Sequence, residues 1–219
     1  MQFDQLKPGF DRLQKKYGDR KLCAIYGAGC LKRPRLCFVF MNPTGRNVSA
    51  DPGWQGLRAP WIGTKNIWRL FLGLGLLERG LFQTISEMGP QEWDPDLAER
   101  VYRELAGRGV YVTNLAKATQ DDARPLPDAV FREYLPLMRR EIAALKPRAI
   151  VTLGNQVSSI LLGRPVKVSD CRKTSSDLCV EGRTYPVYPV HYPVGQGMRN
   201  LPLAVADIRW IIDQGKVDL

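Results

Sequence analysis

The chain has 219 residues, of which 44% are hydrophobic and 25% are charged. These are ordinary values for a folded protein, and they exclude a disordered or fibrous chain. The apolar stretches are too short for a membrane span, and the first residues lack the order of a signal peptide. We therefore expect one soluble, cytoplasmic domain over residues 1–219, monomeric and without membrane contact.

Charge is the first departure from average composition. Lys and Arg number 32 against 22 Asp and Glu, a net charge of +10. Such an excess suits a polyanionic partner, because each neutralised phosphate releases condensed counterions. It is equally consistent with a basic protein that binds no nucleic acid, since net charge does not say where the charges lie.

Cysteine and histidine usage narrows the chemistry further. The five cysteines form no Cys-x-x-Cys pair, and His191 is the single histidine. This excludes multi-histidine metal sites and the zinc deaminase pattern. A four-cysteine site is a remaining hypothesis, although the spacing is not metal-like and inert thiols fit better. Its members would be Cys23, Cys30, Cys171 and Cys179. We expect no metal and no cofactor.

Hydrophobic periodicity predicts strands that alternate with helices. In chain order these are strand 35–41, helices 65–79 and 94–105, strand 109–114, helix 127–145, strand 148–153, helix 155–162, strand 183–190 and helix 200–214. Residues 163–182 are polar, basic and irregular in pattern. The alternation predicts an α/β fold, a three-layer α/β/α sandwich around a central, mainly parallel four-stranded sheet.

Polar or glycine residues end or directly follow each predicted strand: Asn42, Asn114, Gly154 and His191. Since the carboxyl ends of parallel strands meet at one edge of a sheet, we expect these positions to form the working site. The chain has no Gly-x-Gly-x-x-Gly or phosphate-loop motif, so nucleotide binding of those types is not predicted.

Several loop segments suit both a function and a simpler role. The turn Asn-Pro-Thr-Gly at 42–45 brings a polar side chain to a strand end, or is only a turn. Trp61 would stack on a base, or pack in the core. Asn114 would read a pyrimidine edge, or cap a helix. Met198, in a loop with two glycines, has the shape of a wedge for a base stack, and we expect Met198 and Arg199 to be exposed.

The order of these segments resembles the uracil-DNA glycosylase superfamily. The segments are Phe-Met-Asn-Pro-Thr-Gly at 40–45, Ala-Pro-Trp-Ile-Gly at 59–63, Tyr-Val-Thr-Asn-Leu-Ala-Lys at 111–117, and Val-His-Tyr-Pro at 190–193 followed by the Met-Arg loop. The resemblance covers residues 24–213. It implies a DNA repair enzyme that flips a base out of single- or double-stranded DNA and hydrolyses its N-glycosidic bond, leaving an abasic site.

The resemblance also assigns roles to matching positions. It implies catalysis by Asn42, which would position water, and His191, which would stabilise charge on the base. It implies base binding by Met41, Trp61 and Asn114. The DNA contacts that we expect on the same loops are Thr44, Gly45, Arg46, Lys65, Lys117, Met198 and Arg199.

Departures from the family pattern leave base specificity open. Phe40 replaces the usual first glycine, Thr44 replaces the tyrosine that screens out 5-methyl groups, and Tyr192 follows the histidine directly. One branch carries an iron–sulfur cluster on cysteines where this chain has Ala118 and residues 132–134, so we expect no cluster. Uracil is the expected substrate. The alternatives are another deaminated or mismatched base (thymine in G·T, hypoxanthine or xanthine) or a DNA-binding relative with little catalytic activity.

Overall fold

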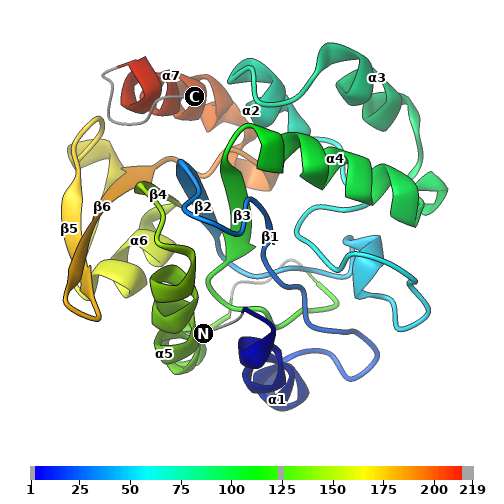
Figure 1. The fold of residues 1–219 in the computed structure, drawn as a ribbon, viewed down its shortest axis with the longest axis horizontal. Helices are drawn as coiled ribbons and strands as arrows, with labels where there is room; N and C mark the ends of the chain where they lie inside the picture. Colours follow the sequence, from blue (N-terminus) through cyan, green and yellow to red (C-terminus); the bar gives the residue numbers. More distant parts are fainter. Residues whose placement is uncertain (1–2, 123–125, 214–219) are drawn as a thin grey trace.

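The computed structural model describes residues 3–122 and 126–213 and contains a six-stranded sheet in the order β1-β3-β2-β4-β6-β5 (Figure 1). The four inner strands β3, β2, β4 and β6 are parallel, and the edge strands β1 and β5 pair antiparallel to their neighbours. The bounds are β1 Ala28–Gly29, β2 Leu36–Phe40, β3 Val110–Asn114, β4 Ala149–Leu153, β5 Ser176–Val180 and β6 Arg183–Val190.

The α/β class and the four predicted strands are confirmed, but the strand count is wrong because the two edge strands were missed. β5 lies in the segment expected to be irregular and forms a hairpin with β6. Its burial alternates, since only Leu178 and Val180 are buried. An edge strand with solvent on one face has no continuous apolar run, so its sequence resembles a loop. β1, with two residues, is too short to give any pattern.

Seven α-helices flank the described sheet: α1 Lys7–Tyr17, α2 Trp68–Gly73, α3 Arg79–Glu87, α4 Pro95–Gly107, α5 Asp128–Leu145, α6 Asn155–Leu162 and α7 Leu201–Ile211. α2 is shorter than the predicted helix 65–79, because the chain turns at Gly75, whose φ of +72° favours glycine. α1 and α3 were not predicted. The last predicted helical position, Gln214, lies outside the described residues.

Two hydrophobic clusters lie on opposite faces of the sheet, and β2 contributes to both. Leu36, Phe38 and Phe40 point into the cluster covered by α2, α3, α4 and α7. Cys37 and Val39 point into the cluster covered by α1, α5 and α6. This alternation is what a strand buried on both faces requires, and it produces the predicted three layers. Among the described helices, none has the length and apolar character needed to cross a bilayer.

Candidate active site

The carboxyl ends of four neighbouring parallel strands bring the predicted site positions to one edge of the sheet. Asn114 ends β3, Asn42 follows β2 by two residues, Gly154 follows β4 and His191 follows β6. Adjacent strands lie about 4.8 Å apart, so β6 is about 10 Å from β2 across β4. The predicted convergence of these strand ends is therefore confirmed.

Backbone hydrogen bonds extend the β2–β3 ladder into the loops and fix the two asparagines relative to each other. Phe40 and Asn114 are register partners. The Leu115 N–H donates to the Phe40 carbonyl at 2.8 Å, and the Ala116 N–H donates to the Met41 carbonyl at 3.1 Å. The segments that carry Asn42 and Asn114 are thus parts of one rigid edge.

Asn114 is the most informative side chain of this edge. It is 2% exposed, and its amide Nδ2 is buried without a hydrogen-bond partner among the described residues. A buried donor without a partner costs about 1–3 kcal/mol. Such a group in a native structure calls for an explanation, and a ligand that supplies the missing acceptor is one that the position of Asn114 at this edge favours.

Asn42 and Met41 lie beside it in a less buried setting. Both are half-buried, and Met41 packs against the cluster that contains β2 residue Val39. The Asn42 amide Nδ2 donates to the carbonyl of Pro43 at 3.1 Å. This bond orients the amide and leaves Oδ1 as its acceptor end.

Three aromatic rings from three separate segments meet at this edge. The Phe40 ring lies edge-on to the rings of Trp61 and Tyr192, with centroids 5.0 Å and 6.5 Å apart. Burial raises the pKa of Tyr192 to about 12, so its phenol is neutral at physiological pH. The departures at Phe40 and Tyr192 are therefore linked: each fills space against the other and connects the loops of the site.

The loop that carries Trp61 is held in an unusual conformation. Trp61 is half-buried with a φ of +72°, and its indole Nε1 is buried without a partner among the described residues. The Thr64 hydroxyl donates to the Trp61 carbonyl at 2.7 Å. A non-glycine residue at positive φ persists only where its surroundings impose it, and such positions cluster at functional sites. The Trp61 side chain thus packs on Phe40 and also has a buried indole N–H without a partner among the described residues.

His191 directly follows β6 and is half-buried, and the loop after it is partly different from the prediction. Residues Gly195–Asn200 form a short 3-10 helix, η5. Arg199 is exposed as expected, but Met198 is half-buried, which corrects the expectation of an exposed Met-Arg pair. Met198 lies within η5, where its carbonyl accepts the Leu201 N–H.

The remaining predicted DNA contacts lie mostly on accessible loop segments. Gly45, Arg46 and Lys65 are exposed. Thr44 is half-buried and pairs with Gln120 in an isolated bridge. Lys65 reaches the carbonyl of Ser86, 2.8 Å from its Nζ.

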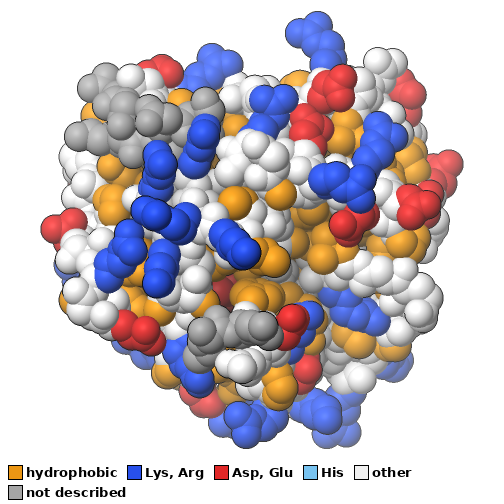
Figure 2. All heavy atoms as spheres, viewed as in Figure 1, with side chains coloured by type: hydrophobic (Ala, Val, Ile, Leu, Met, Phe, Trp, Pro, Cys, Tyr) orange, Lys and Arg blue, Asp and Glu red, His pale blue; other side chains and the backbone are white. Residues whose placement is uncertain are grey.

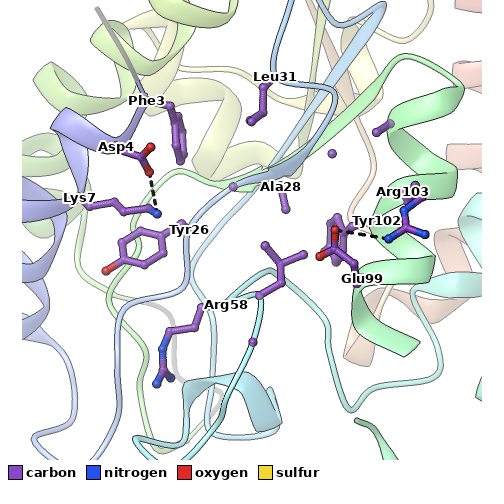
Figure 3. Close-up of a pocket in the computed structure, with 15 residues that line it drawn as sticks. Phe3, Asp4, Lys7, Tyr26, Ala28, Leu31, Arg58, Glu99, Tyr102 and Arg103 are labelled. Atoms are coloured by element: carbon purple, nitrogen blue, oxygen red, sulfur yellow. Dashed lines mark ion pairs between the residues drawn. The ribbon is translucent and has the colours of Figure 1, made fainter. Parts of the chain in front are cut away.

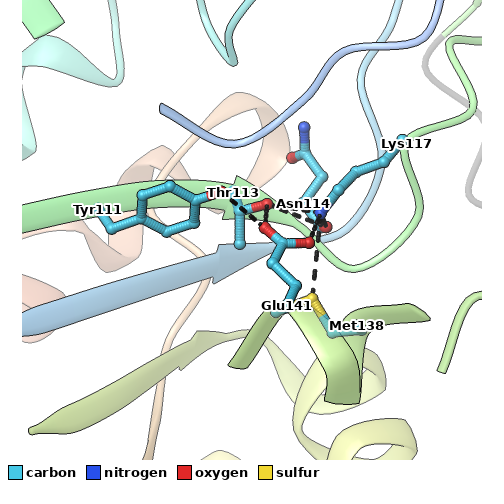
Figure 4. Close-up of polar contacts among 6 residues, drawn as sticks. All are labelled: Tyr111, Thr113, Asn114, Lys117, Met138 and Glu141. Atoms are coloured by element: carbon cyan, nitrogen blue, oxygen red, sulfur yellow. Dashed lines mark hydrogen bonds and ion pairs between the residues drawn. The ribbon is translucent and has the colours of Figure 1, made fainter. Parts of the chain in front are cut away.

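Lys117 is a correction, because it cannot contact a phosphate in this conformation. Its side chain is 0% exposed, and its Nζ lies 2.7 Å from Oε2 of Glu141, which is also 0% exposed. Figure 4 shows the ammonium pointing inward, among groups from β3 and α5. Burial lowers the pKa of Lys117, and the carboxylate of Glu141 opposes that effect.

Glu141 is the site-proximal residue that sequence reasoning missed. It lies on the buried face of α5, with Tyr134, Met138 and Leu145. A glutamate within an otherwise apolar stripe is the signal that was available, since buried carboxylates require a partner.

A cavity of about 590 Å³ lies away from this edge, beside β1 (Figure 3). Several of its polar side chains already have partners: Lys7 pairs with Asp4 at 2.8 Å, and the Tyr26 hydroxyl donates to Asp11. Arg58 donates to backbone carbonyls, including that of Ser49 at 2.6 Å. The cavity therefore does not compete with the carboxyl-end edge as a site of chemistry.

The described side chains do not suit a metal centre. No group of three or more His, Cys, Asp or Glu side chains that could hold an ion occurs in 3–122 and 126–213. The four-cysteine hypothesis therefore finds no support. Ala118 and Tyr134, which belong to the segments where the resemblance led us to expect no cluster cysteines (Ala118 and residues 132–134), are both fully buried. The Phe10 ring stacks on Tyr134 at 6.4 Å, so aromatic packing fills this region.

The comparison with known families agrees with this geometry. The family model described as the Uracil DNA glycosylase superfamily matches residues 26–203. The chain belongs to this superfamily, as the motif order predicted, and thus to a family of DNA glycosylases that act on DNA. No curated protein matches the chain.

Proposed function

We propose that this chain is a monofunctional uracil-DNA glycosylase that flips uracil out of DNA, hydrolyses its N-glycosidic bond and leaves an abasic site. The observation that carries the proposal is the buried, unpartnered Nδ2 of Asn114 at the edge shared with Asn42 and His191. A carboxamide offers one acceptor and a donor pair, which match the N3–H and O4 of uracil.

Extrusion of the base comes first. Unstacking costs a few kcal/mol and is least at a mismatch. Stacking on Trp61 offsets about 1–3 kcal/mol of this cost, and Met198 enters the space that the base leaves. Arg46, Lys65 and Arg199 are exposed on the flanking loops, where they hold phosphates and fix the register of the protein on DNA.

Cleavage then separates charge. As the C1′–N1 bond breaks, its electron pair moves onto the pyrimidine and positive charge develops on the sugar. His191 donates a hydrogen bond to O2 of the leaving base, and backbone N–H groups at Met41 and Asn42 support it. The Asn42 Oδ1 accepts from a water whose oxygen bonds to C1′, and the released proton passes to the leaving base or to solvent. Because an amide does not ionise, Asn42 orients the water without acting as a strong base.

Thr44 favours a second candidate, a glycosylase for thymine in G·T pairs or for another deaminated base. Its half-buried side chain is smaller than the tyrosine that screens out 5-methyl groups in uracil-specific members, so the site has room at this position.

The test uses labelled oligonucleotides with one uracil in single strand, U·A or U·G, followed by hot alkali. Parallel substrates carry thymine in G·T, hypoxanthine or xanthine. We expect breakage at uracil, and we expect Asn114→Ala and His191→Ala each to reduce the rate by about 10²–10³. Asn66→Ala removes an exposed asparagine from the segment before α2 and serves as the matched control.

Each outcome is decisive. Breakage only at another base would move the assignment to the second candidate. Duplex binding without breakage of any substrate would identify a non-catalytic DNA-binding relative. Equal activity of Asn114→Ala and Asn66→Ala would overturn the assigned role of the buried amide.

A further inference from the structure

Lys117 and Glu141 form an ion pair directly behind the base-binding edge. Both side chains are 0% exposed. Burial of a charged pair carries a desolvation penalty of several kcal/mol per ion, and an apolar pair of similar volume is often at least as stable. Stability alone therefore does not explain the pair.

The ammonium of Lys117 contacts the residue that would read the base. Its Nζ lies 2.6 Å from the backbone carbonyl of Asn114 and 2.6 Å from the Thr113 hydroxyl. Lys117 is three residues beyond Asn114, so its side chain turns back to bind a carbonyl of its own segment. The ring of Phe10, 4.9 Å from Nζ, closes the remaining side.

Glu141 anchors this turn to α5. Its Oε2 lies 2.7 Å from the Lys117 ammonium, and its Oε1 accepts from the hydroxyls of Tyr111 and Thr113, both at 2.8 Å. Tyr111, Thr113 and Asn114 all belong to β3. Figure 4 shows that the network joins the end of β3 to α5, with Asn114 at its outer end.

We propose that Lys117 and Glu141 are positioning residues that fix the Asn114 peptide and so aim its side-chain amide at the flipped pyrimidine. This inference rests on the proposed function. The Asn114 Nδ2 has no partner among the described residues to hold it in place, so its direction depends on the backbone that the ammonium binds. Small misplacements at such a site cost about 10²-fold in rate.

The main test variant is Lys117→Met/Glu141→Gln. It is neutral at both positions, Met replaces the lysine stem, and Gln keeps an acceptor for Tyr111 and Thr113. We expect the inhibition constant for free uracil to rise about 10-fold or more and kcat/KM for uracil excision to fall, since the Asn114 carbonyl loses its donor. We also expect the Asn114 side-chain amide signals in ¹⁵N NMR to broaden, a readout that does not depend on activity.

A rescue variant separates positioning from packing. Lys117→Gln/Glu141→Gln is also neutral, but the glutamine side chain introduced in place of Lys117 can donate to the Asn114 carbonyl again. We expect it to recover a substantial part of the uracil affinity lost with Met. Equal affinities of the Met and Gln variants would overturn the proposal.

The matched control is the Arg172–Asp207 pair, whose atoms lie 2.9 Å apart and which joins a different loop to α7. We expect Arg172→Met/Asp207→Asn to change thermal stability while leaving uracil inhibition within twofold. A wild-type chain that cleaves no substrate and does not bind uracil would refute the proposed function. An active wild type with Lys117→Met/Glu141→Gln equally active and sharp in NMR would refute only the positioning role.

A second, independent observation concerns the opposite end of the strands. Figure 2 shows Lys and Arg side chains gathered over the region where Figure 1 places β2, β4 and β6, with acidic side chains only around the margin. The backbone places two basic segments side by side, since the Arg33 N–H donates to the Leu145 carbonyl at 2.8 Å. We call the following set the amino-end patch: Lys32, Arg33, Arg35 and Lys146.

The amino-end patch is available to a polyanion. Lys32, Arg33 and Lys146 are exposed and Arg35 is half-buried. None of the four takes part in an ion pair among the described residues. A five-residue strand is about 16 Å long, and the patch lies at the amino ends of the strands, so about this distance separates it from Asn42 at their carboxyl ends. A straight duplex bound at the carboxyl-end edge does not reach the amino-end patch. Reaching both would require the DNA to bend around the protein, which costs several kcal/mol.

The geometry points to a second surface for duplex DNA, which holds a separate DNA segment while the carboxyl-end edge engages another. The test is bridging of two labelled, uracil-free duplexes at low salt. We expect the glutamine variant of all four patch residues to bridge about 10-fold less, with single-turnover excision from a short duplex within twofold of wild type. The charge-matched control replaces four exposed cations elsewhere by glutamine: Arg12, Lys15, Arg79 and Arg100.

The comparison of the two quadruple variants decides the outcome. Equal loss of bridging in both would show a general effect of net charge and overturn the proposal. Stronger competition by double-stranded RNA than by DNA would also overturn it and assign the patch to RNA. Both results are independent of excision activity.

Discussion

Lys117–Glu141 and Arg172–Asp207, two of the ion pairs among the described residues, each join a loop to a helix, and they differ in their exposure to water. Lys117 and Glu141 are both fully buried, within a web of hydroxyl and carbonyl partners. Asp207 is 1% exposed, but Arg172 is 34% exposed and holds Asp207 through three contacts of 2.9–3.2 Å. A guanidinium at the surface keeps part of its hydration, so the Arg172–Asp207 pair does not need additional hydroxyl and carbonyl partners.

The difference in desolvation between the two pairs indicates which of them costs the fold more stability. The bidentate Arg172–Asp207 pair attaches one loop to α7 with little desolvation of the arginine. The Lys117–Glu141 pair is fully desolvated and lies behind the only predicted base-binding side chain that is itself buried. Placement of the more costly pair at the site fits a role in orientation rather than in stability.

The largest expected difference between the pairs is in stability after a single change. Glu141→Gln leaves Lys117 buried and uncompensated, and we expect a loss of about 3–5 kcal/mol in the free energy of unfolding. Asp207→Asn leaves Arg172 partly hydrated, and we expect a loss of about 1–2 kcal/mol. Urea denaturation measures both. Equal losses would show that burial does not distinguish the pairs.

Thr113→Val tests the web around the first pair more gently. The hydroxyl donates to Glu141 and accepts from Lys117, so its loss should cost about 1–2 kcal/mol of stability and weaken uracil inhibition. Thr152→Val is the matched control, since Thr152 is a buried threonine on β4 whose hydroxyl lies 2.8 Å from that of Ser158. We expect a similar stability loss there with unchanged uracil inhibition. Weaker inhibition in both variants would indicate a general effect of loosening the sheet.

The surroundings of the Lys117–Glu141 pair make the free energy of unfolding depend on alkaline pH. Burial, and then the Glu141 carboxylate, raises the pKa of Tyr111 well above its ordinary value of 10.0. The unfolded chain therefore releases this proton first, the folded state binds more protons, and stability falls as pH rises above about 10. The lowered pKa of Lys117 acts in the opposite direction over the range below 10.5.

Tyr111→Phe isolates one side of this balance. We expect it to cost about 1 kcal/mol at pH 7, because a buried hydrogen bond to Glu141 is lost. Above pH 10 its stability should fall less steeply than that of wild type, by up to about 1.4 kcal/mol per pH unit. Denaturation curves from pH 8 to 11 measure this slope. Parallel slopes in the two proteins would mean that Tyr111 ionises in the folded state as it does in the unfolded one.

The inner strands and their meeting edge were predictable because strands buried on both faces have continuous apolar runs. The four runs at 35–41, 109–114, 148–153 and 183–190 carried this signal, and the polar residues after them marked the edge. β5 was missed because its outward positions are polar, and α2 was predicted too long because its apolar stripe continues past the glycines that end the helix.

The site was predictable only as far as local sequence fixes a position. Asn114 ends a strand, His191 directly follows one and Asn42 follows one by two residues, so topology alone places them. Lys117 was misplaced because its burial depends on Glu141, 24 positions further along the chain, and nothing near Lys117 signals that partner. The contacts of Phe40 with Trp61 and Tyr192 are likewise long-range.

The smallest expected effect distinguishes buried from exposed cations at the site. Arg199 is exposed on η5, so Arg199→Ala should lower the slope of log K for duplex binding against log salt by about 1. Lys117→Met/Glu141→Gln should leave the slope unchanged, because a buried ammonium releases no counterion when DNA binds. Fluorescence anisotropy titrations over a series of salt concentrations measure both slopes. A reduced slope for the Lys117 variant would mean that its ammonium leaves Glu141 to meet a phosphate in the complex. The original expectation of a DNA contact would then hold for the bound state, and the pair would be a switch rather than a fixed support.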